Sequence, residues 1–262
     1  MLKVSLLGAG LLAALVSGCA TSSYNVATEQ QETLFISTER EIALGESVAK
    51  RVEEQFDVVR DPKFLEQLDR VGERIAAVAD RKDLSYRFQI VKPREGEDAP
   101  NAFALPGGPI YVTESLFDLV KSDDELAAVL AHEVGHVVAK HTVKRIQAAV
   151  GLQALQILAA GARTDPRTQR GMDLAFTSLM LEYSQQDELE SDRLSTKYLR
   201  AAGFDPSAAI RFMERLRDFT FDQPTRRFSY FRTHPYFADR IRLLRQQAQG
   251  QITFDDYINV KE

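Results

Sequence analysis

The segment His132-Glu133-Val134-Gly135-His136 fits the pattern HExxH. Residues four apart lie on one face of a helix, so the two histidines can direct their imidazoles at one metal ion. The glutamate, one residue further round the helix, can hold a water molecule that the ion polarises. Ser122 and Glu125 form a capping box before the apolar run that contains the motif, which predicts that the motif is helical. The pattern therefore indicates a site for one catalytic metal ion.

A catalytic zinc ion needs a third protein ligand and an open position. The extended motif HExxHxxGxxH is excluded, because Ala139 and Thr142 stand where that motif has glycine and histidine. His141 is one position off and on the wrong face, so we expect it at the surface. A carboxylate from a later helix is the other solution, and Glu188 and Asp192 lie four apart on one helix face.

The sequence assigns different roles to these two carboxylates. We expect Glu188 to bind the metal and Asp192 to accept a hydrogen bond from the second nitrogen of a ligand histidine. Glu190 points elsewhere on the same helix and is the rival third ligand. Imidazole and carboxylate donors indicate Zn²⁺, one ion per chain, although they also bind other divalent ions.

The rest of the chain predicts a mainly helical fold with a small sheet. A capping box at residues 38–41 and Asp61-Pro62 predict the starts of two helices. The alternation over residues 86–90 predicts a half-buried strand, and residues 101–113 predict two short strands around a Pro-Gly-Gly turn at a sheet edge. After the motif helix, a polar break is expected at 161–171, and further helices are expected over 143–160, 171–182, 184–201, 207–220 and 236–249.

The N-terminus predicts export and a lipid anchor. A positive start, an apolar run over residues 4–16 and the small residues Ser17-Gly18 are typical of a secretory signal peptide, and the run is too short to span a membrane. The sole cysteine, Cys19, follows in a context that resembles the bacterial lipobox, so we expect its thiol to be acylated. Ala20, in place of Asp, indicates the outer membrane. Residues 20–33 are polar and lack helical periodicity, as in a tether.

The composition excludes some classes of function. The chain has 262 residues, of which 44% are hydrophobic and 27% charged, which suits one globular domain. Its formal net charge of −5 gives no cationic footprint for nucleic acid. The local basic run Arg240, Arg242 and Arg245 is expected to be a solvated helix face.

Several segments together resemble the M48 family of metallopeptidases, and most of all its periplasmic and lipoprotein members. They are the HEVGH motif, residues 101–108, Tyr183–Arg193 and Thr233–Arg240, and Glu41–Gly45 is similar to the first helix of that group. The resemblance covers about residues 36–250. It implies an α+β fold, a mainly helical zincin-type (gluzincin) metalloprotease domain with a small sheet beside the HExxH helix. The expected organisation is a signal peptide over 1–18, a lipidated tether over 19–35 and the protease domain over 36–262.

The resemblance also implies roles for individual residues. The metal ligands carry over onto His132, His136 and Glu188, the general base acting on zinc-bound water onto Glu133, and a proton donor onto Asp192. Two positions depart from the family pattern without touching the ligands. They are Gln185, where the family usually has Arg, and Ser191, where it usually has Ala. The tetratricopeptide repeats of some relatives are not found.

The implied reaction is hydrolysis of a peptide bond, whose oxyanion needs a donor besides the metal. We expect His234, at a loop-to-helix junction before Pro235, to be that donor. Two alternatives stay open, a helix-cap or core histidine, and a ligand that closes the zinc site as a latency switch. The segment Asn101, Ala102, Phe103 and Ala104 is expected to form the cleft edge, where an extended substrate adds as a strand.

That mode of binding reads backbone more than side chains and suits unfolded chains. The expected function is therefore a zinc-dependent endopeptidase that degrades unfolded or misassembled envelope proteins, in protein quality control at the periplasmic face of the outer membrane. One alternative is a membrane-tethered chaperone or adaptor that acts with outer-membrane assembly machinery and has a latent zinc site. Another is a lipid-anchored binding protein without a metal. Glu133 argues against a purely structural zinc site, which has no use for a general base.

Overall fold

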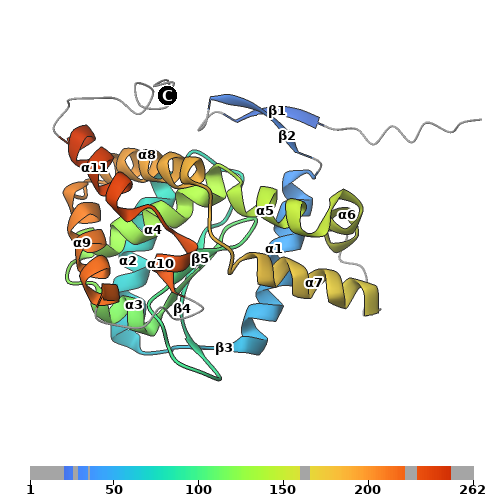
Figure 1. Ribbon diagram of the computed structural model, residues 1–262, viewed down its shortest axis with the longest axis horizontal. Coiled ribbons are helices and arrows are strands. Elements are labelled where there is room, and N and C mark those ends of the chain that lie inside the picture. The colour runs from blue at the N-terminus through green and yellow to red at the C-terminus, as the bar shows by residue number, and fades with distance from the viewer. Residues whose placement is uncertain (1–20, 26–28, 35, 160–165, 222–228, 249–262) are drawn as a thin grey trace, which may run out of the picture.

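The computed structural model describes residues 21–25, 29–34, 36–159, 166–221 and 229–248. A four-stranded sheet has the order β3 (Phe56–Val58), β4 (Arg87–Pro93), β6 (Pro109–Thr113) and β5 (Ala102–Ala104). Strands β4 and β6 are parallel and the other pairs are antiparallel. The mainly helical α+β architecture predicted from the sequence is confirmed (Figure 1).

The β5–β6 hairpin contains the predicted Pro-Gly-Gly turn, and β5 lies at a sheet edge as expected. Gly107 and Gly108 have φ angles of 74° and 115°, a backbone region that favours glycine. A Cβ on Gly107 would also lie 2.6 Å from the Cα of Ile42, in the first long helix. Glu41 of that helix accepts a hydrogen bond from the Gly107 N–H at 3.2 Å, so the turn is fixed against the helix.

The HExxH motif lies on the central helix α4 (Asp123–Val138). The Ser122 hydroxyl caps it by accepting from the Glu125 N–H at 3.2 Å, and three acidic residues in the first turn complement the helix dipole. Every residue from Glu125 to Val138 is buried, which is expected for a helix covered by other elements on all sides.

Helix α4 packs closely against α8 (Gln185–Ala201), which begins with a capping box between Ser184 and Asp187. A Cβ on Gly135 would lie 2.6 Å from Ser191 Oγ and 3.0 Å from Ser191 O. Only glycine allows this approach, and the Ser191 hydroxyl also donates to the backbone carbonyl of His132. The two helices that carry the predicted ligands are therefore in direct contact.

The β5–β6 hairpin separates two hydrophobic clusters. Ala102, Ala104 and Ile110 pack on one side with α4, α8, α2 (Pro62–Val78), α9 (Ser207–Phe221) and α11 (Phe237–Ala248). Phe103 and Tyr111 alternate to the other side, against α1 (Thr38–Gln55), α5 (His141–Val150), α6 (Leu152–Ala159) and α7 (Pro166–Ser178). This alternation is the period-two pattern of a sheet buried on both faces.

Several boundaries differ from the sequence predictions. The helix expected over 143–160 is divided at Gly151, whose φ is 76°, into α5 and α6. The predicted polar break contains the start of α7 at Pro166, and residues 160–165 lie outside the described part. Helix α1 is capped by Ser37 rather than by Thr38. The short elements β3, α3 (Glu114–Leu119) and α10 (Tyr230–Thr233) were not predicted.

The segment predicted as a tether forms an antiparallel hairpin of β1 (Thr21–Asn25) and β2 (Gln30–Leu34). Asn25 Nδ2 donates to the carbonyl of Val138 at 3.0 Å, which joins the hairpin to the end of α4. The predicted signal peptide and Cys19 lie outside the described residues. Among the helices that are described, none is long and apolar enough to cross a membrane.

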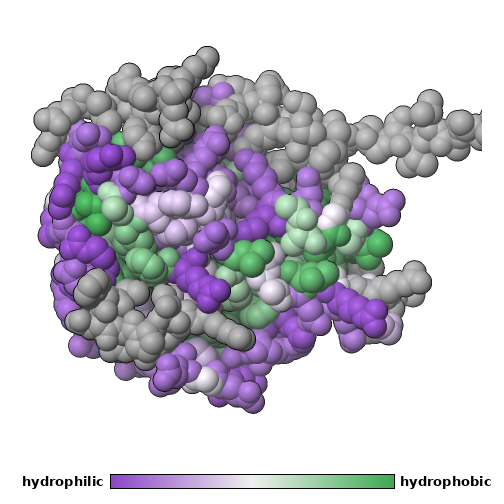
Figure 2. Space-filling view, in the orientation of Figure 1, coloured by the Kyte–Doolittle hydropathy of each residue, from purple (hydrophilic) through white to green (hydrophobic). Residues whose placement is uncertain are grey.

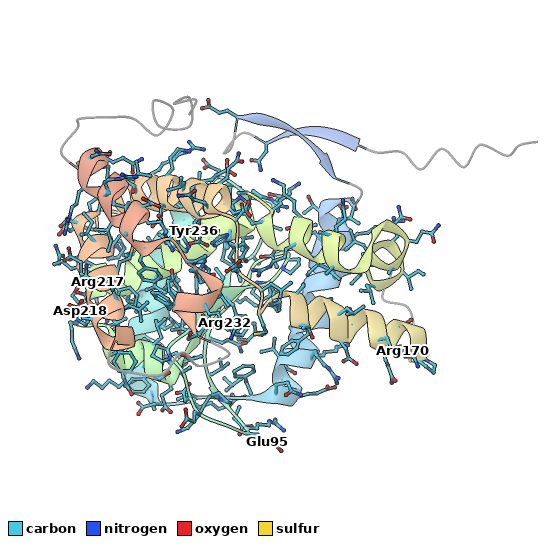
Figure 3. All side chains as sticks on the ribbon, viewed as in Figure 1. Glu95, Arg170, Arg217, Asp218, Arg232 and Tyr236 are labelled. Atoms are coloured by element: carbon cyan, nitrogen blue, oxygen red, sulfur yellow. The ribbon has the colours of Figure 1, made fainter. Side chains whose placement is uncertain are left out.

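Charged side chains cover the outside of the domain. Those labelled in Figure 3, among them Glu95, Arg170, Arg217 and Asp218, lie at its periphery. Figure 2 shows apolar surface over α6 and α7, and the large exposed apolar side chains described in these helices are Ile157 and Leu174. The HExxH residues, in contrast, are all buried.

Candidate active site

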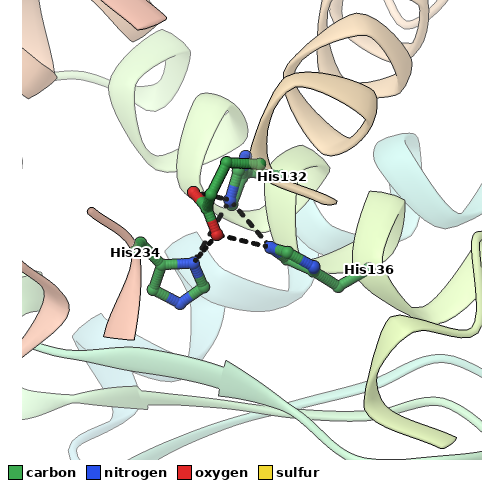
Figure 4. A group of neighbouring side chains, drawn as sticks. His132, His136 and His234 are labelled. Carbon is green, nitrogen blue, oxygen red and sulfur yellow. Dashed lines mark hydrogen bonds and ion pairs between the residues drawn. The ribbon is translucent and has the colours of Figure 1, made fainter. Parts of the chain in front are cut away.

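Four buried side chains meet between α4, α8 and the end of α10. They are His132, His136, Glu188 and His234, and one nitrogen or oxygen from each lies within 4.8 Å of the others (Figure 4). His132 Nε2 is 3.0 Å from His136 Nε2 and 3.4 Å from His234 Nδ1. Glu188 Oε1 lies 3.4 Å from His136 Nε2 and 3.0 Å from His234 Nδ1.

These spacings fit a tetrahedral zinc ion. Zinc bonds to nitrogen and oxygen are about 2.0–2.2 Å long, so the ligand atoms of a tetrahedral site lie about 3.3–3.5 Å apart. The separations between the four side chains are close to that value. Three imidazoles and one carboxylate are also donors that zinc accepts. The residues present therefore fit the ion that the sequence predicts.

The carboxylate of Glu133 faces the same space without a donor. The residue is fully buried, and neither side-chain oxygen has a hydrogen-bond partner within the described part of the chain. The Nε2 of His234 lies 3.5 Å from Oε1 of this carboxylate. Burial raises the pKa of Glu133, so this carboxylate has an increased affinity for a proton. Such a group is suited to accept a proton from water.

Asp192 lies behind His132, the place inferred for it from the sequence. Its Oδ1 is 2.9 Å from His132 Nδ1, while Nε2 of the ring points to the ligand cluster. The carboxylate therefore holds the proton on Nδ1 and leaves Nε2 free to bind a metal. Burial and Arg240 both disfavour a charged ring, yet the hydrogen bonds to Asp192 and Glu188 raise the pKa of His132 to about 9.

Arg240 is a part of the site that the sequence did not reveal. It was expected on a solvated face with Arg242 and Arg245, but its side chain is fully buried and only the other two are exposed. Its Nε and Nη2 donate to Asp192 at 2.8 and 2.7 Å, and Nη1 forms an ion pair with Glu188. Burial raises the pKa of the Glu188 and Asp192 carboxyls, but this guanidinium lowers it, and the net result is a lowered pKa for both.

A signal for this burial exists in the sequence. Arg240 lies three residues after Phe237 and four before Leu244, so it shares the apolar stripe of α11 with these two buried residues. A lone arginine on an apolar stripe indicates a buried partner of opposite charge. The expectation of a solvated face was wrong for Arg240, because Arg240, Arg242 and Arg245 were treated as one group although they lie on different faces of α11.

His141 was expected at the surface and is instead buried, with 2% of its area exposed. Helix α4 ends at Val138, and Lys140 has a φ of 57°, so the chain turns before α5 begins. The turn places His141 Nδ1 2.9 Å from His136 Nδ1. Glu190, the rival third ligand, lies 3.0 Å from His141 Nε2 and is not among the four clustered ligands.

The residues expected to bind substrate, Asn101, Ala102, Phe103 and Ala104, are at most 2% exposed. Helix α10, which ends just before His234, is held against the residues that lead into strand β5. The Tyr230 N–H donates to Pro100 O at 2.8 Å, and Thr233 Oγ1 donates to Asn101 Oδ1 at 3.2 Å. These bonds position His234 over the site.

Two tyrosines restrict the ligand rings. Tyr183 stacks on His136 with ring centroids 3.8 Å apart, and Tyr230 stacks on His234 at 4.3 Å. The Tyr183 hydroxyl lies 3.2 Å from Thr142 Oγ1, which donates to Ala104 O. Neither tyrosine was singled out in the sequence as a site residue. The contacts of Tyr183 connect the His136 ring to the β5 strand.

The sequence profile of Peptidase family M48 matches residues 62–248. The chain is 35% identical over 179 residues to "Mitochondrial metalloendopeptidase OMA1" of Schizosaccharomyces pombe, covering 68% of this chain and 51% of that protein. It is 26% identical over 218 residues to "Beta-barrel assembly-enhancing protease" of Escherichia coli (strain K12), a match that covers 80% of this chain and 44% of that protein. This chain thus spans about half the length of these two relatives. "Metalloprotease LoiP" of the same E. coli strain is 25% identical over 255 residues, a match that covers 94% of this chain and 97% of that protein.

Replacement of Arg240 by methionine should strongly destabilise the metal-free protein. The change leaves the buried carboxylates of Glu188 and Asp192 without their guanidinium, and breaking a buried ion pair costs about 3–5 kcal/mol. Urea unfolding in the presence of a chelator measures the free energy of unfolding. Arg242→Met, on the exposed side of the same helix, is the control and should change it by less than about 1 kcal/mol. Equal losses in the two variants would contradict this role of Arg240.

Proposed function

The chain belongs to peptidase family M48, a family of zinc metallopeptidases, and on that premise we propose that it is an endopeptidase of unfolded or misassembled envelope proteins. The observation that supports this most is the set of four ligand atoms at tetrahedral spacing beside Glu133, a buried carboxylate without a hydrogen-bond donor among the described residues. A structural zinc site needs no such carboxylate.

We assign the zinc ligands to His132, His136 and Glu188, as inferred from the sequence. When bound there, zinc makes water a stronger acid and polarises the scissile carbonyl. Glu133 follows the ligand His132 directly on α4 and accepts the proton of the attacking water, then delivers it to the leaving amine. Asp192 keeps the His132 ring in the required tautomer and orientation.

The proposed substrate lies extended along β5. This strand pairs with β6 on one side only, but its residues are buried in this structure. A peptide can therefore add to the other side through main-chain hydrogen bonds only after the segment over residues 229–234 moves. A folded protein does not offer a free extended segment, so the mode favours unfolded chains. The E. coli relative is named for enhancing β-barrel assembly, and we extend to this chain only the proposal that its substrates are envelope proteins.

The decisive experiment is degradation of unfolded casein by residues 20–262, compared with Glu133→Gln. We expect the wild type to cleave casein and the variant to be at least about 10²-fold slower, because it lacks the general base. Gel analysis of the digest gives the rate, and the zinc content of both proteins should be equal.

A tightly folded protein serves as the control substrate and should remain intact. Equal zinc with no cleavage by either protein would favour the alternative function, a chaperone or adaptor with a latent zinc site. Equal cleavage by both proteins would contradict the role of Glu133.

The position of His234 supports regulation of the proposed enzyme. Its Nδ1 occupies the fourth corner of the ligand cluster, which a catalytic zinc site keeps open for water or substrate. We propose that the segment over residues 229–234 closes the site and must move before substrate reaches β5. The alternative role for His234 is the oxyanion donor inferred from the sequence.

His234→Ala should therefore raise the rate of casein cleavage, because the fourth position is then open without movement of the segment. The control is Arg232→Ala, an exposed residue of the same short helix (Figure 3), which should leave the rate unchanged. A fall in the rate with zinc retained would instead assign His234 to oxyanion stabilisation. An unchanged rate would reject both roles.

We further propose that residues 1–18 are a signal peptide, that 19–35 connect a lipid on Cys19 to the domain, and that the protein faces the periplasm from the outer membrane. Radiolabelled palmitate should be incorporated into the wild type and not into Cys19→Ser. The variant should also move from the outer-membrane fraction to the soluble periplasm. An unlabelled wild type would contradict the lipid anchor.

A further inference from the structure

His136 has a hydrogen-bond partner behind it that is itself a histidine. Its Nε2 faces the ligand cluster, 3.0 Å from His132 Nε2, while its Nδ1 is 2.9 Å from His141 Nδ1. The other ring nitrogen of His141 lies 3.0 Å from Glu190 Oε2. Both rings are buried, whereas the Glu190 side chain is 13% exposed. The three groups form a line from the cluster toward the surface of α8.

The hydrogen bonds in this line permit one arrangement of protons when His136 binds a metal. The lone pair of His136 Nε2 is then used by the ion, so the proton must be on Nδ1, which donates to His141 Nδ1. His141 Nδ1 has to accept and therefore carries no proton, which leaves the proton of that ring on Nε2. This N–H donates to Glu190, and a carboxylate only accepts. Glu190 thus fixes both tautomers.

Asp187 does not provide an equal alternative to Glu190. Its Oδ1 is 3.4 Å from His141 Nε2, beyond the usual length of a hydrogen bond of this kind. Its other oxygen accepts from the N–H and hydroxyl of Ser184, which form the cap of α8. Glu190 is therefore the principal acceptor for His141.

The backbone is shaped to make this contact. In a continuous helix, a residue five positions after His136 would lie on a different face. Here α4 ends and Lys140 adopts a left-handed conformation, with φ of 57° and ψ of 26°, which is unfavourable for a residue with a side chain by about 1–2 kcal/mol. The turn makes His141 the first residue of α5 and directs its ring back to His136.

We propose that His141, held by Glu190, is a positioning residue that fixes the tautomer and orientation of the ligand His136. The inference deepens the proposed function and rests on it only in that His136 is assigned as a zinc ligand. His132 has its carboxylate, Asp192, in direct contact, and His136 has Glu190 through one intervening imidazole. Both ligand histidines are thereby anchored to α8.

Zinc affinity tests this role without reference to proteolysis. Loss of a partner behind a metal ligand lowers metal affinity about 10–100-fold, and we expect this for His141→Ala in a competition assay with a chromophoric chelator. His141→Asn should recover most of the affinity, because its side-chain oxygen can accept from His136 Nδ1. Glu190→Gln, whose amide oxygen still accepts from His141, should lose less than His141→Ala.

The matched control is Val143→Ala, which removes buried volume two positions further along α5. It should lower thermal stability and leave zinc affinity at the wild-type value. If His141 only fills space, His141→Ala will behave like Val143→Ala and His141→Asn will give no recovery. Either result would overturn the proposal.

Nitrogen-15 NMR of histidine-labelled protein provides a second readout, since the chain contains only four histidines. In the metal-free and the zinc-loaded wild type, we expect the proton of His136 on Nδ1 and that of His141 on Nε2. The opposite tautomer in either ring would overturn the proposal. A wild type that binds no zinc would refute the proposed metal site, and the spectrum of the metal-free protein would still decide on the hydrogen-bond line.

Discussion

The contact between Gly135 and Ser191 is the constraint on which the rest of the site depends. A Cβ at position 135 would collide with α8, so the absence of a side chain lets the two helices approach closely. At that separation, His132 and His136, which are one turn apart on α4, face Glu188 and Asp192, which are one turn apart on α8. The ligand set and the hydrogen bond behind His132 both follow from this approach.

The site formed at this contact contains several buried charged groups. Three buried carboxylates, those of Glu133, Glu188 and Asp192, are enclosed with the guanidinium of Arg240, the one buried arginine among the described residues. A dication would balance the remaining negative charge. Without the ion, the increased proton affinity of His132 and Glu133 provides part of the same compensation. The site is therefore built to hold positive charge, whether as metal or as protons.

The sequence predicted those parts of the site that depend on local spacing. The capped motif helix α4, the capped start of α2 and the β5–β6 hairpin follow from helical and strand periods and from cap and turn residues. Arg240 and His141 were misjudged because their burial depends on contacts with distant segments and, for His141, on the left-handed turn at Lys140. The division of a predicted helix at Gly151 likewise depends on a backbone angle that the amino-acid pattern alone did not fix.

The β1–β2 hairpin has a consequence for where the proposed enzyme can act. Residues 21–34 would span about 50 Å if extended, which would give a lipid-anchored domain a wide radius of action. Strands β1 and β2 pair antiparallel, so Thr21 lies opposite Leu34, and Asn25 is joined to the end of α4. The two ends are therefore separated by only a fraction of that length. With a lipid on Cys19, the catalytic helix would remain near the bilayer surface. The proposed enzyme would then cleave unfolded chains that stay near the membrane because it can reach them there, before it recognises any feature of their sequence.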